Sequence, residues 1–353
     1  MKKLFTQKIM EWHVKDNKRT MPWKGEKEPY KIWISEIILQ QTRVKQGLSY
    51  YNNFIEKFPT IKSLAVAPDE MVFKAWEGLG YYTRCKNLLV TARNIVNNQN
   101  GHFPSTYNNI IALKGIGPYT AAAISSFAYG LPHAVVDGNV FRVLARYFGE
   151  ELPIDSTKGK EYFTLLANEL LFKKDSAVYN QAIMDFGATV CKPQIPECEH
   201  CILHKSCRAY NNGMVNMLPI KEKQLVKKKR WFTYFIFSLK NEVLVNKRLQ
   251  KDIWENLYEF YLLETENEWE CKSDEIQKWL YGQLGVTTFK IDNISKTFSQ
   301  QLTHQTLKGR FVTVSIDKIP VGLKHLQAVK KEDLTNLAFP KFINQYLLLE
   351  KAA

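Results

Sequence analysis

Four of the six cysteines in this chain of 353 residues stand close together, with the spacing C-x6-C-x2-C-x5-C. Thiolates on so short a loop can converge on one centre, and sulfur ligation suits either zinc or an iron–sulfur cluster. Zinc sites more often contain two tight cysteine pairs, whereas only one pair is tight here. From the residues alone, zinc and an iron–sulfur cluster are almost equally good interpretations. A third interpretation is that these are unrelated buried cysteines. The candidate ligands are Cys191, Cys198, Cys201 and Cys207.

Two carboxylates are candidates for acid–base chemistry. Glu36 lies beside the apolar stripe of a predicted helix over 30–41, where partial burial would raise its pKa. Asp137 directly precedes another predicted helix, so it could instead serve only as the N-cap of that helix. Glu36 could likewise be an ordinary, partly exposed residue at the side of its helix. Cleavage of a glycosidic bond needs an acid for the leaving group and an ionised carboxylate that steadies an oxocarbenium-like sugar. Glu36 and Asp137 suit these two roles in that order.

A helix, a tight turn and a second helix are predicted over Leu113–Ala121. Gly115 and Gly117 can take positive φ and allow a close backbone approach, and Pro118 suits the first turn of a helix. The free N–H groups at the start of the second helix would hold a phosphate, helped by the helix dipole. Many helix–helix turns contain such glycines and bind nothing, so the motif alone is weak.

Helices that would position these groups fill almost the whole chain as far as residue 207. Besides the helix over 30–41, we expect helices near 47–57, 68–77, 84–98, 106–113, 118–129, 139–148, 158–172 and 176–190.

The composition changes after Cys207. Asn211–Gly213 and the basic run Lys221–Arg230 are typical of an exposed linker. The aromatic and β-branched residues that follow indicate strands, so the second part of the chain is expected to be α+β. Its expected elements are strands at Trp231–Phe237 and Phe311–Ile316 and helices near 274–282 and 340–350.

The length predicts about two domains. The 49 Lys and Arg residues exceed the 35 Asp and Glu residues and leave a net charge of +14, which favours a polyanion such as nucleic acid, although a basic surface kept for solubility would look the same. No apolar segment of a secretory signal is present. Glycine and proline interrupt the charge-free stretch 115–136, which indicates a buried helix too short to span a bilayer. We therefore expect an intracellular protein, in which clustered cysteines indicate a metal.

The cysteine spacing resembles the [4Fe-4S] loop of the helix-hairpin-helix DNA glycosylases, which include endonuclease III and the MutY-type adenine glycosylases. The turn at Gly115 and Gly117 resembles the hairpin of the same family and precedes the cysteine loop, as it does there. The resemblance implies a DNA-binding hairpin and a [4Fe-4S] cluster held by the four cysteines. It also implies a basic loop that faces DNA, with Lys192, Lys205 and Arg208 in that role.

Residues 20–42 resemble the start of the MutY-type core, with the patterns T-M-P-W, P-Y-K-I-W and S-E followed by Q-T. The resemblance makes Glu36 the acid that protonates adenine N7 and then helps to activate water. Asp137, in a D-G-N element, would stabilise the sugar cation with support from Asn139. Endonuclease III-like relatives carry a lysine where this chain has Tyr119, and only lysine could form an imine. The resemblance therefore implies base removal without strand cleavage, with Tyr119 lining the pocket.

The same resemblance implies contacts with a flipped base. Gln41 and the segment Gly78–Tyr82 resemble wedge elements that enter the base stack. Trp23 would stack on the purine and Gln181 matches a position near that base, while the role of Lys24 stays open. The candidate contacts to DNA in this part of the chain are Trp23, Lys24, Gln41, Thr42, Leu79, Tyr81, Gly115, Gly117 and Gln181.

Residues 231–350 are compatible with the Nudix-like domain that inspects 8-oxoguanine in MutY-type enzymes. The segment Trp254–Phe260 resembles the family pattern W-x-x-L-x-E-F, whereas the G-x5-E-x7-R-E-x2-E-E box of pyrophosphate hydrolysis is absent, so recognition is the expected role. The F-S-H reading loop of the family has its best counterpart at Leu302, Thr303 and His304, and 298–300 is an alternative register.

We therefore predict a multidomain protein with an all-α helix-hairpin-helix glycosylase core over 1–209, including the iron–sulfur loop 191–207. A basic linker over 210–230 and an α+β Nudix-like domain over 231–353 would follow. The predicted function is removal of adenine opposite 8-oxoguanine or guanine in duplex DNA, by a monomer in the cytoplasm that associates with the nucleoid through DNA and not with membranes. The alternatives are an endonuclease III-like glycosylase/lyase on oxidised pyrimidines, which Tyr119 disfavours, and a non-catalytic damage-binding protein, which the two acids disfavour.

Overall fold

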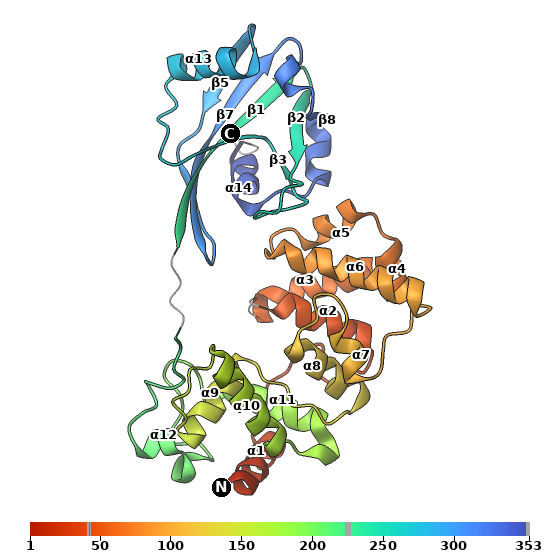
Figure 1. Cartoon of the computed structure of the whole chain (residues 1–353), viewed down its shortest axis with the longest axis vertical. Helices are drawn as coiled ribbons and strands as arrows, with labels where there is room; N and C mark the ends of the chain where they lie inside the picture. The colour runs from red at the N-terminus through yellow and green to blue at the C-terminus, as the bar shows by residue number, and fades with distance from the viewer. Residues whose placement is uncertain (41, 43, 223–226, 351–353) are drawn as a thin grey trace. The chain divides into compact units, whose positions relative to one another are not determined.

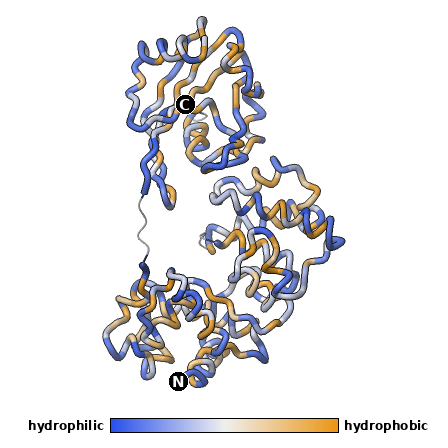
Figure 2. Tube along the Cα trace, in the orientation of Figure 1, coloured by the Kyte–Doolittle hydropathy of each residue, from blue (hydrophilic) through white to orange (hydrophobic). Residues whose placement is uncertain are grey.

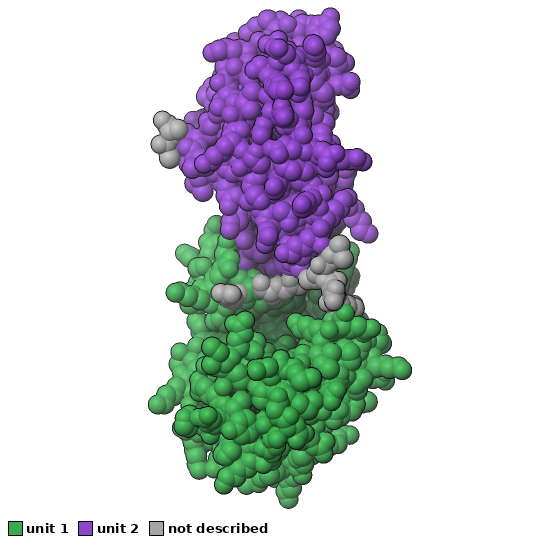
Figure 3. Space-filling view, turned by 90° about the vertical axis from the view of Figure 1, so that its left-hand side faces the viewer, with its two compact units in different colours: residues 1–66, 87–224 green, residues 67–86, 225–353 purple. Residues whose placement is uncertain are grey.

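The structure, a computed structural model, describes residues 1–40, 42, 44–222 and 227–350. It divides into two compact units (Figure 3): the first contains Met1–Val66 and Asn87–Gln224, and the second contains Ala67–Lys86 and Leu225–Ala353. The first unit is helical, and the second is built on a sheet (Figure 1). The helical half of the sequence therefore contributes one segment, 67–86, to the unit that the C-terminal half forms.

The first unit consists of α-helices joined by short turns, which confirms the prediction of a helical first part. Its α-helices are α1 (Lys2–Lys15), α2 (Pro29–Leu39), α3 (Val44–Lys57), α4 (Ile61–Val66), most of α6 (Tyr82–Asn98), α7 (Tyr107–Ile111), α8 (Pro118–Tyr129), α9 (Gly138–Phe148), α10 (Thr157–Leu170), α11 (Ser176–Thr189) and α12 (Arg208–Asn211). Two 3-10 turns, η1 (Lys173–Asp175) and η2 (His204–Ser206), lie among the later helices.

Apolar side chains from α1, α9, α10 and α11 form the main core of this unit, and Phe5, Tyr147, Phe163 and Phe186 are among them. The charge-free stretch of the sequence forms the buried helix α8, which ends at Gly130 in the left-handed conformation with φ 66°. No helix among the described residues is long and apolar enough to cross a membrane.

The second unit contains an eight-stranded sheet with the order β3-β2-β1-β7-β5, and β4, β6 and β8 pair with β1, β7 and β2. β1 and β7 run parallel with Tyr234 opposite Phe311, and the other pairs are antiparallel. The strands are β1 (Lys228–Leu239), β2 (Glu242–Lys247), β3 (Tyr258–Glu259), β4 (Tyr261–Thr265), β5 (Phe289–Ile294), β6 (Phe298–Gln301), β7 (Gln305–Ile316) and β8 (Gln327–Lys330).

Helices pack on both faces of this sheet (Figure 1). Successive side chains of β1 point to opposite faces. Phe235 packs with α13 (Ser273–Leu284), where Trp279 stacks on it at 4.7 Å between ring centroids, while Tyr234 packs with Phe342 of α14 (Lys341–Glu350). Burial on both sides explains why β1 is almost continuously apolar. The strands and helices expected in this part are confirmed, and two 3-10 turns, η3 (Val321–Leu323) and η4 (Lys331–Asn336), complete the unit.

The predicted basic linker differs from the structure at its end, because residues 228–230 are the first residues of β1. The start of this strand is hydrophilic (Figure 2), yet Arg230 is only 9 % exposed. Its guanidinium donates to the carboxylates of Asp252 at 2.8 Å and Glu264 at 2.6 Å. These ion pairs come from residues further along the chain and hold a basic segment in the sheet. Residues 223–226 of the predicted linker lie outside the described residues.

The second unit also includes α5 (Asp69–Trp76) and the turn that follows it. The carboxylate of Glu77 accepts hydrogen bonds from the backbone N–H of Phe339 and from Nδ2 of Asn344, both at 2.8 Å. Lys86, at the start of α6, forms an ion pair with Glu255 at 2.6 Å. These contacts attach residues 67–86 to the C-terminal part of the chain and so position the turn at 78–82.

Candidate active site

A cavity of ≈ 820 Å³ in the first unit is lined by both predicted catalytic carboxylates. Glu36 comes from α2, Tyr119 from the first turn of α8 and Asp137 from the start of α9. Gln41, a further predicted contact, lies outside the described residues. The other predicted site residues that line the same cavity are Trp23, Lys24, Thr42, Asn139 and Gln181.

The carboxyl group of Glu36 has the environment of a general acid. The residue is 7 % exposed, and its Oε2 accepts a hydrogen bond from the Tyr119 hydroxyl at 2.6 Å. Burial raises the pKa of Glu36 to about 7; the charge of Asp137 adds to this effect and the hydrogen bond from Tyr119 opposes it. A carboxyl group with this pKa retains a proton near neutral pH and can give it to a leaving group.

Asp137 is both the N-cap of α9 and a carboxylate of the cavity, so both interpretations of this residue apply. Its Oδ1 accepts hydrogen bonds from the backbone N–H groups of Asn139 at 2.9 Å and Val140 at 2.8 Å. Its Oδ2 accepts from Nδ2 of Asn139 at 2.6 Å, and Arg142 donates to Oδ1 of Asn139 at 2.8 Å. Burial raises the pKa of Asp137, while these hydrogen bonds and the charge of Arg142 lower it. The hydrogen bonds therefore favour the ionised form, and Arg142 fixes the asparagine that makes two of them.

Lys24 and Arg19, which line the cavity, belong to an ion-pair cluster that the sequence did not predict. Lys24 Nζ lies 3.0 Å from Asp185 Oδ2, and Arg19 Nη1 lies 2.8 Å from Asp185 Oδ1. Asp185 is fully buried on α11 and also accepts from Nε2 of Gln181 at 2.9 Å. An aspartate inside an apolar helical stretch is the only local signal that could have indicated this cluster, because a buried charge needs partners. Trp23 lines the same cavity.

The predicted hairpin turn requires glycine at one position only. Gly115 has φ +80°, and a Cβ atom there would lie 2.6 Å from Cβ of Asn87. Gly117 is the N-cap of α8 with φ −94°, which any residue can adopt, so positive φ is absent there. A Cβ on Gly117 would meet nothing within 4 Å, which leaves the start of α8 open to an approaching group.

A second cavity, of ≈ 470 Å³, lies within the second unit and is lined by 78–83, 252–255 and 300–305, which include the predicted contacts Leu79 and His304. The hydroxyl groups of Tyr81 and Thr303 are hydrogen-bonded to each other. Residues 302–304 form the turn between β6 and β7, whereas the alternative register places Ser299 within β6, paired with Lys308. The wedge segment and the favoured reading loop therefore meet at one cavity.

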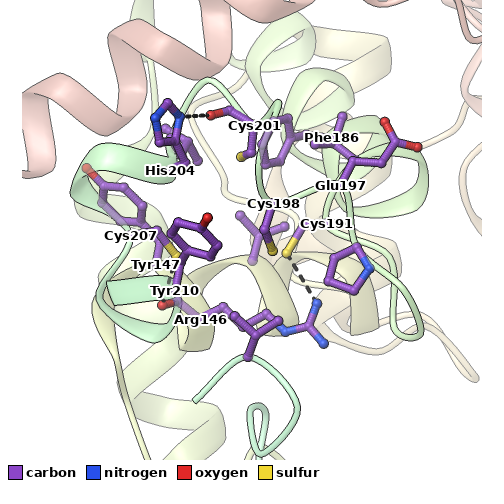
Figure 4. Close-up of a pocket in the computed structure, with 15 residues that line it drawn as sticks. Arg146, Tyr147, Phe186, Cys191, Glu197, Cys198, Cys201, His204, Cys207 and Tyr210 are labelled. Carbon is purple, nitrogen blue, oxygen red and sulfur yellow. Dashed lines mark hydrogen bonds between the residues drawn. The ribbon is translucent and has the colours of Figure 1, made fainter. Parts of the chain in front are cut away.

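The four clustered cysteines line one small cavity with Arg146 and His204 (Figure 4). Arg146 Nη1 lies 3.5 Å from Sγ of Cys191, and the thiol of Cys207 donates to the carbonyl oxygen of Arg146 at 3.5 Å. Burial, with a smaller contribution from the neighbouring thiolates, raises the pKa of the Cys201 thiol to about 12. Buried thiols that oppose one another's ionisation are suited to a metal that replaces their protons.

Two of the three basic residues expected to face DNA beside these cysteines are engaged within the protein. Lys192 pairs with Glu197 at 2.8 Å, and Arg208 donates to the carbonyl oxygen of Phe148 at 3.2 Å.

Family models and solved structures show the class of protein to which this chain is similar. Residues 34–165 match the family described as HhH-GPD superfamily base excision DNA repair protein, and residues 233–349 match the NUDIX domain. The structure of a thermostable thymine-DNA glycosylase superposes with a TM-score of 0.56 at 30 % identity, over 60 % of this chain and 97 % of that one. Endonuclease III in a non-covalent DNA complex shares the fold, with a TM-score of 0.52 at 22 % identity, over 60 % and 98 % of the two chains. The fold is that of a helix-hairpin-helix base-excision protein with a Nudix-like domain.

The particular family follows from the sequence relatives. The adenine DNA glycosylase of Buchnera aphidicola subsp. Baizongia pistaciae is 36 % identical over 90 % of this chain and 88 % of its own length. The human adenine DNA glycosylase is 39 % identical over 58 % of this chain and 39 % of its own length. The chain belongs to the adenine DNA glycosylase family, and the predicted MutY-type resemblance is confirmed.

Proposed function

We propose that this enzyme binds duplex DNA and removes adenine that is mispaired with 8-oxoguanine or guanine. The observation that carries the proposal is that Glu36, with a pKa of about 7, and Asp137 line the same cavity of ≈ 820 Å³. A nucleoside flipped out of the duplex would fit a cavity of this size, and Trp23 would offer an aromatic surface for the base.

In the proposed reaction, Glu36 gives its proton to the adenine ring as the bond between base and sugar breaks. The hydroxyl of Tyr119 holds the Glu36 carboxyl group at 2.6 Å and supports its anion after the proton has left. Asp137, whose carboxylate accepts hydrogen bonds from Asn139 and Val140, stabilises the positive charge that develops on the sugar. Glu36, now a carboxylate, takes a proton from the attacking water. This chain has Tyr119 at the position where endonuclease III-like enzymes carry the lysine that forms an imine. The product is therefore an abasic site in an intact strand.

The second cavity supports the proposed choice of the opposite base. 8-Oxoguanine differs from guanine by a carbonyl group at C8 and an N–H at position 7. The hydroxyls of Tyr81 and Thr303 are both donors and acceptors, and they meet at the cavity where the predicted wedge and reading loop converge. These hydroxyls would exchange their mutual hydrogen bond for hydrogen bonds with the two groups that distinguish the lesion.

We further propose that Cys191, Cys198, Cys201 and Cys207 hold a [4Fe-4S] cluster. All four line one cavity, yet no three of the Cys, His, Asp and Glu side chains that the structure describes converge as ligands of one metal ion. The preference for an iron–sulfur cluster over a single zinc ion rests on the spacing C-x6-C-x2-C-x5-C, which resembles the [4Fe-4S] loop of the helix-hairpin-helix DNA glycosylases. When bound, the cluster would fix the loop at 191–207 against α9.

Base release from three duplexes tests the proposed function. We expect adenine release from duplexes with adenine opposite 8-oxoguanine and opposite guanine, and no release of an oxidised thymine. Release of the oxidised thymine alone, with strand nicking, would support the lyase alternative instead. The variant Glu36→Gln should bind the duplex and release no base, and near-normal release by this variant would show that Glu36 is not the acid. Metal analysis should give iron and acid-labile sulfide in equal amounts, and zinc without sulfide would refute the cluster.

A further inference from the structure

Asp185 stands behind the active-site cavity without lining it, and it accepts hydrogen bonds from four side chains. Three of these donors, Arg19, Lys24 and Gln181, line the cavity themselves, and the fourth is Asn17. The donor atoms are Arg19 Nη1 at 2.8 Å, Asn17 Nδ2 at 2.9 Å, Gln181 Nε2 at 2.9 Å and Lys24 Nζ at 3.0 Å. Since the residue is 0 % exposed, this carboxylate depends on all four partners and holds them in fixed positions.

The arrangement determines which end of the Gln181 amide faces the cavity. A glutamine amide has a donor end and an acceptor end, and either can point to a given neighbour. An ionised carboxylate accepts hydrogen bonds only, so Asp185 binds Nε2 of Gln181. The carbonyl oxygen Oε1 of Gln181 hydrogen-bonds to no residue among those described and is left to the cavity. The cavity therefore presents an acceptor at this position.

We propose that Asp185 is a positioning residue that fixes the amide of Gln181 so that the cavity selects a base with an amino group and disfavours one with a keto oxygen in its place. The inference rests on the proposed function. Adenine carries an amino group at C6, which donates to Oε1 of Gln181. Hypoxanthine has the same ring system with a keto oxygen at C6, which would face Oε1 acceptor to acceptor. A buried polar group left without its partner is what gives such a site its discrimination.

The variant Asp185→Asn should weaken this discrimination. The asparagine is nearly the same size, but it presents one acceptor and one donor in place of two acceptors. The amide nitrogen of the asparagine takes the place either of Oδ1, which Gln181 shares with Arg19, or of Oδ2, which Lys24 shares with Asn17. The Gln181 amide is therefore no longer held in one orientation. In the first case the amide nitrogen of the asparagine faces Gln181. Gln181 then turns its own amide to accept this hydrogen bond, and its Nε2 faces the cavity. An amino group there suits a keto oxygen and opposes adenine.

The measurement is the single-turnover rate of base release from duplexes that carry adenine or hypoxanthine opposite the same 8-oxoguanine. The ratio of the two rates should favour adenine in the wild type and fall about tenfold or more in Asp185→Asn, from the usual cost of one mismatched buried hydrogen bond. The double variant Asp185→Asn/Gln181→Glu should recover the ratio, because both oxygens of a glutamate are acceptors. A merely structural role of Asp185 would lower both rates in equal proportion, and an unchanged ratio would overturn the proposal.

A second variant and a control keep the test decisive if Asp185→Asn folds poorly. Gln181→Met removes the acceptor and leaves Asp185 in place, so it should lose the same preference; a full preference for adenine in this variant would also overturn the proposal.

Asp175, the N-cap of the same helix, contacts the backbone N–H of Val178 and is the matched control, since Asp175→Asn should leave the ratio unchanged. A wild type that releases no adenine would refute the proposed function itself, whereas adenine release with unchanged ratios would refute the role of Asp185 alone.

Discussion

Replacing Glu36 with glutamine should make the protein more stable, and the gain should grow with pH. An unfolded glutamate loses its proton near its ordinary pKa of 4.5, whereas burial in the fold raises the pKa of Glu36 to about 7. The folded state therefore binds the proton more tightly than the unfolded state does. As the pH rises through this window, the unfolded state loses its proton while the folded state still holds it. The free energy of unfolding therefore falls as the pH rises. Glutamine has no such proton, so the variant escapes this loss.

The magnitude follows from the two pKa values. The interval between 4.5 and about 7, at about 1.36 kcal/mol for each pKa unit, corresponds to roughly 3 kcal/mol when ionisation is complete. At about pH 5 only a small part of this loss has occurred, and by about pH 8 nearly all of it has. The difference in free energy of unfolding between Glu36→Gln and the wild type should therefore increase by about 2 to 3 kcal/mol between these two conditions.

Urea unfolding followed by far-ultraviolet circular dichroism would measure this difference at a series of pH values. Glutamine changes hydrogen bonding as well as charge, but that contribution is constant with pH and does not affect the slope. Glu56→Gln, at an exposed position of α3, is the control and should show no such increase. A stability difference that stays constant from pH 5 to pH 8 would refute the reasoning, because the Glu36 carboxyl group would then titrate alike in the folded and unfolded states.

Three other changes test neighbouring parts of the structure. Tyr119→Phe removes a hydrogen bond that lowers the pKa of Glu36, so the pH at which single-turnover base release declines should move upward; an unchanged pH–rate profile would contradict the assigned contact. Gly115→Ala forces a side chain into the left-handed conformation and should cost about 1 to 2 kcal/mol of unfolding free energy and weaken duplex binding, whereas Gly117→Ala is the tolerated control. Equal stability of the two alanine variants would be the contrary outcome. Arg230→Met leaves Glu264 without its ion pair and leaves Asp252 paired with Arg248 alone, so it should cost roughly 2 kcal/mol in urea unfolding. A loss below about 0.5 kcal/mol, the contribution of one weak surface pair, would show that the pairs contribute little.

The parts of the fold with local signals could be predicted from the sequence. Both ends of the helix α9 can be predicted from local residues. Asp137 caps its first turn, and Gly149 ends it in the left-handed conformation with φ 67°. The strand β1 could be recognised by its aromatic and β-branched residues, which suit a sheet buried on both faces. The two catalytic candidates were found through motifs, and the structure places both at one cavity.

Features that depend on distant partners could not be predicted in this way. Asp185 meets Arg19 across 166 positions of the chain, so no local window contains both halves of the ion pair. The basic residues before Trp231 have the composition of a linker, and only the carboxylates of Asp252 and Glu264 draw Arg230 into the sheet. Composition describes what a segment would do by itself, and long-range ion pairs override it.

The assignment of residues 67–86 to the second unit has a consequence for synthesis on the ribosome. The partner of Glu77 on α14, Asn344, follows it by 267 positions. At about 5 to 20 residues per second, the nascent segment waits roughly a quarter of a minute to a minute before that partner leaves the ribosome. During this interval α5 must stay incompletely packed while the remaining helices on either side of it can already assemble. The final packing of α5 therefore waits for the synthesis of α14, and a chain that stops before residue 344 would lack the partner that Glu77 has on that helix.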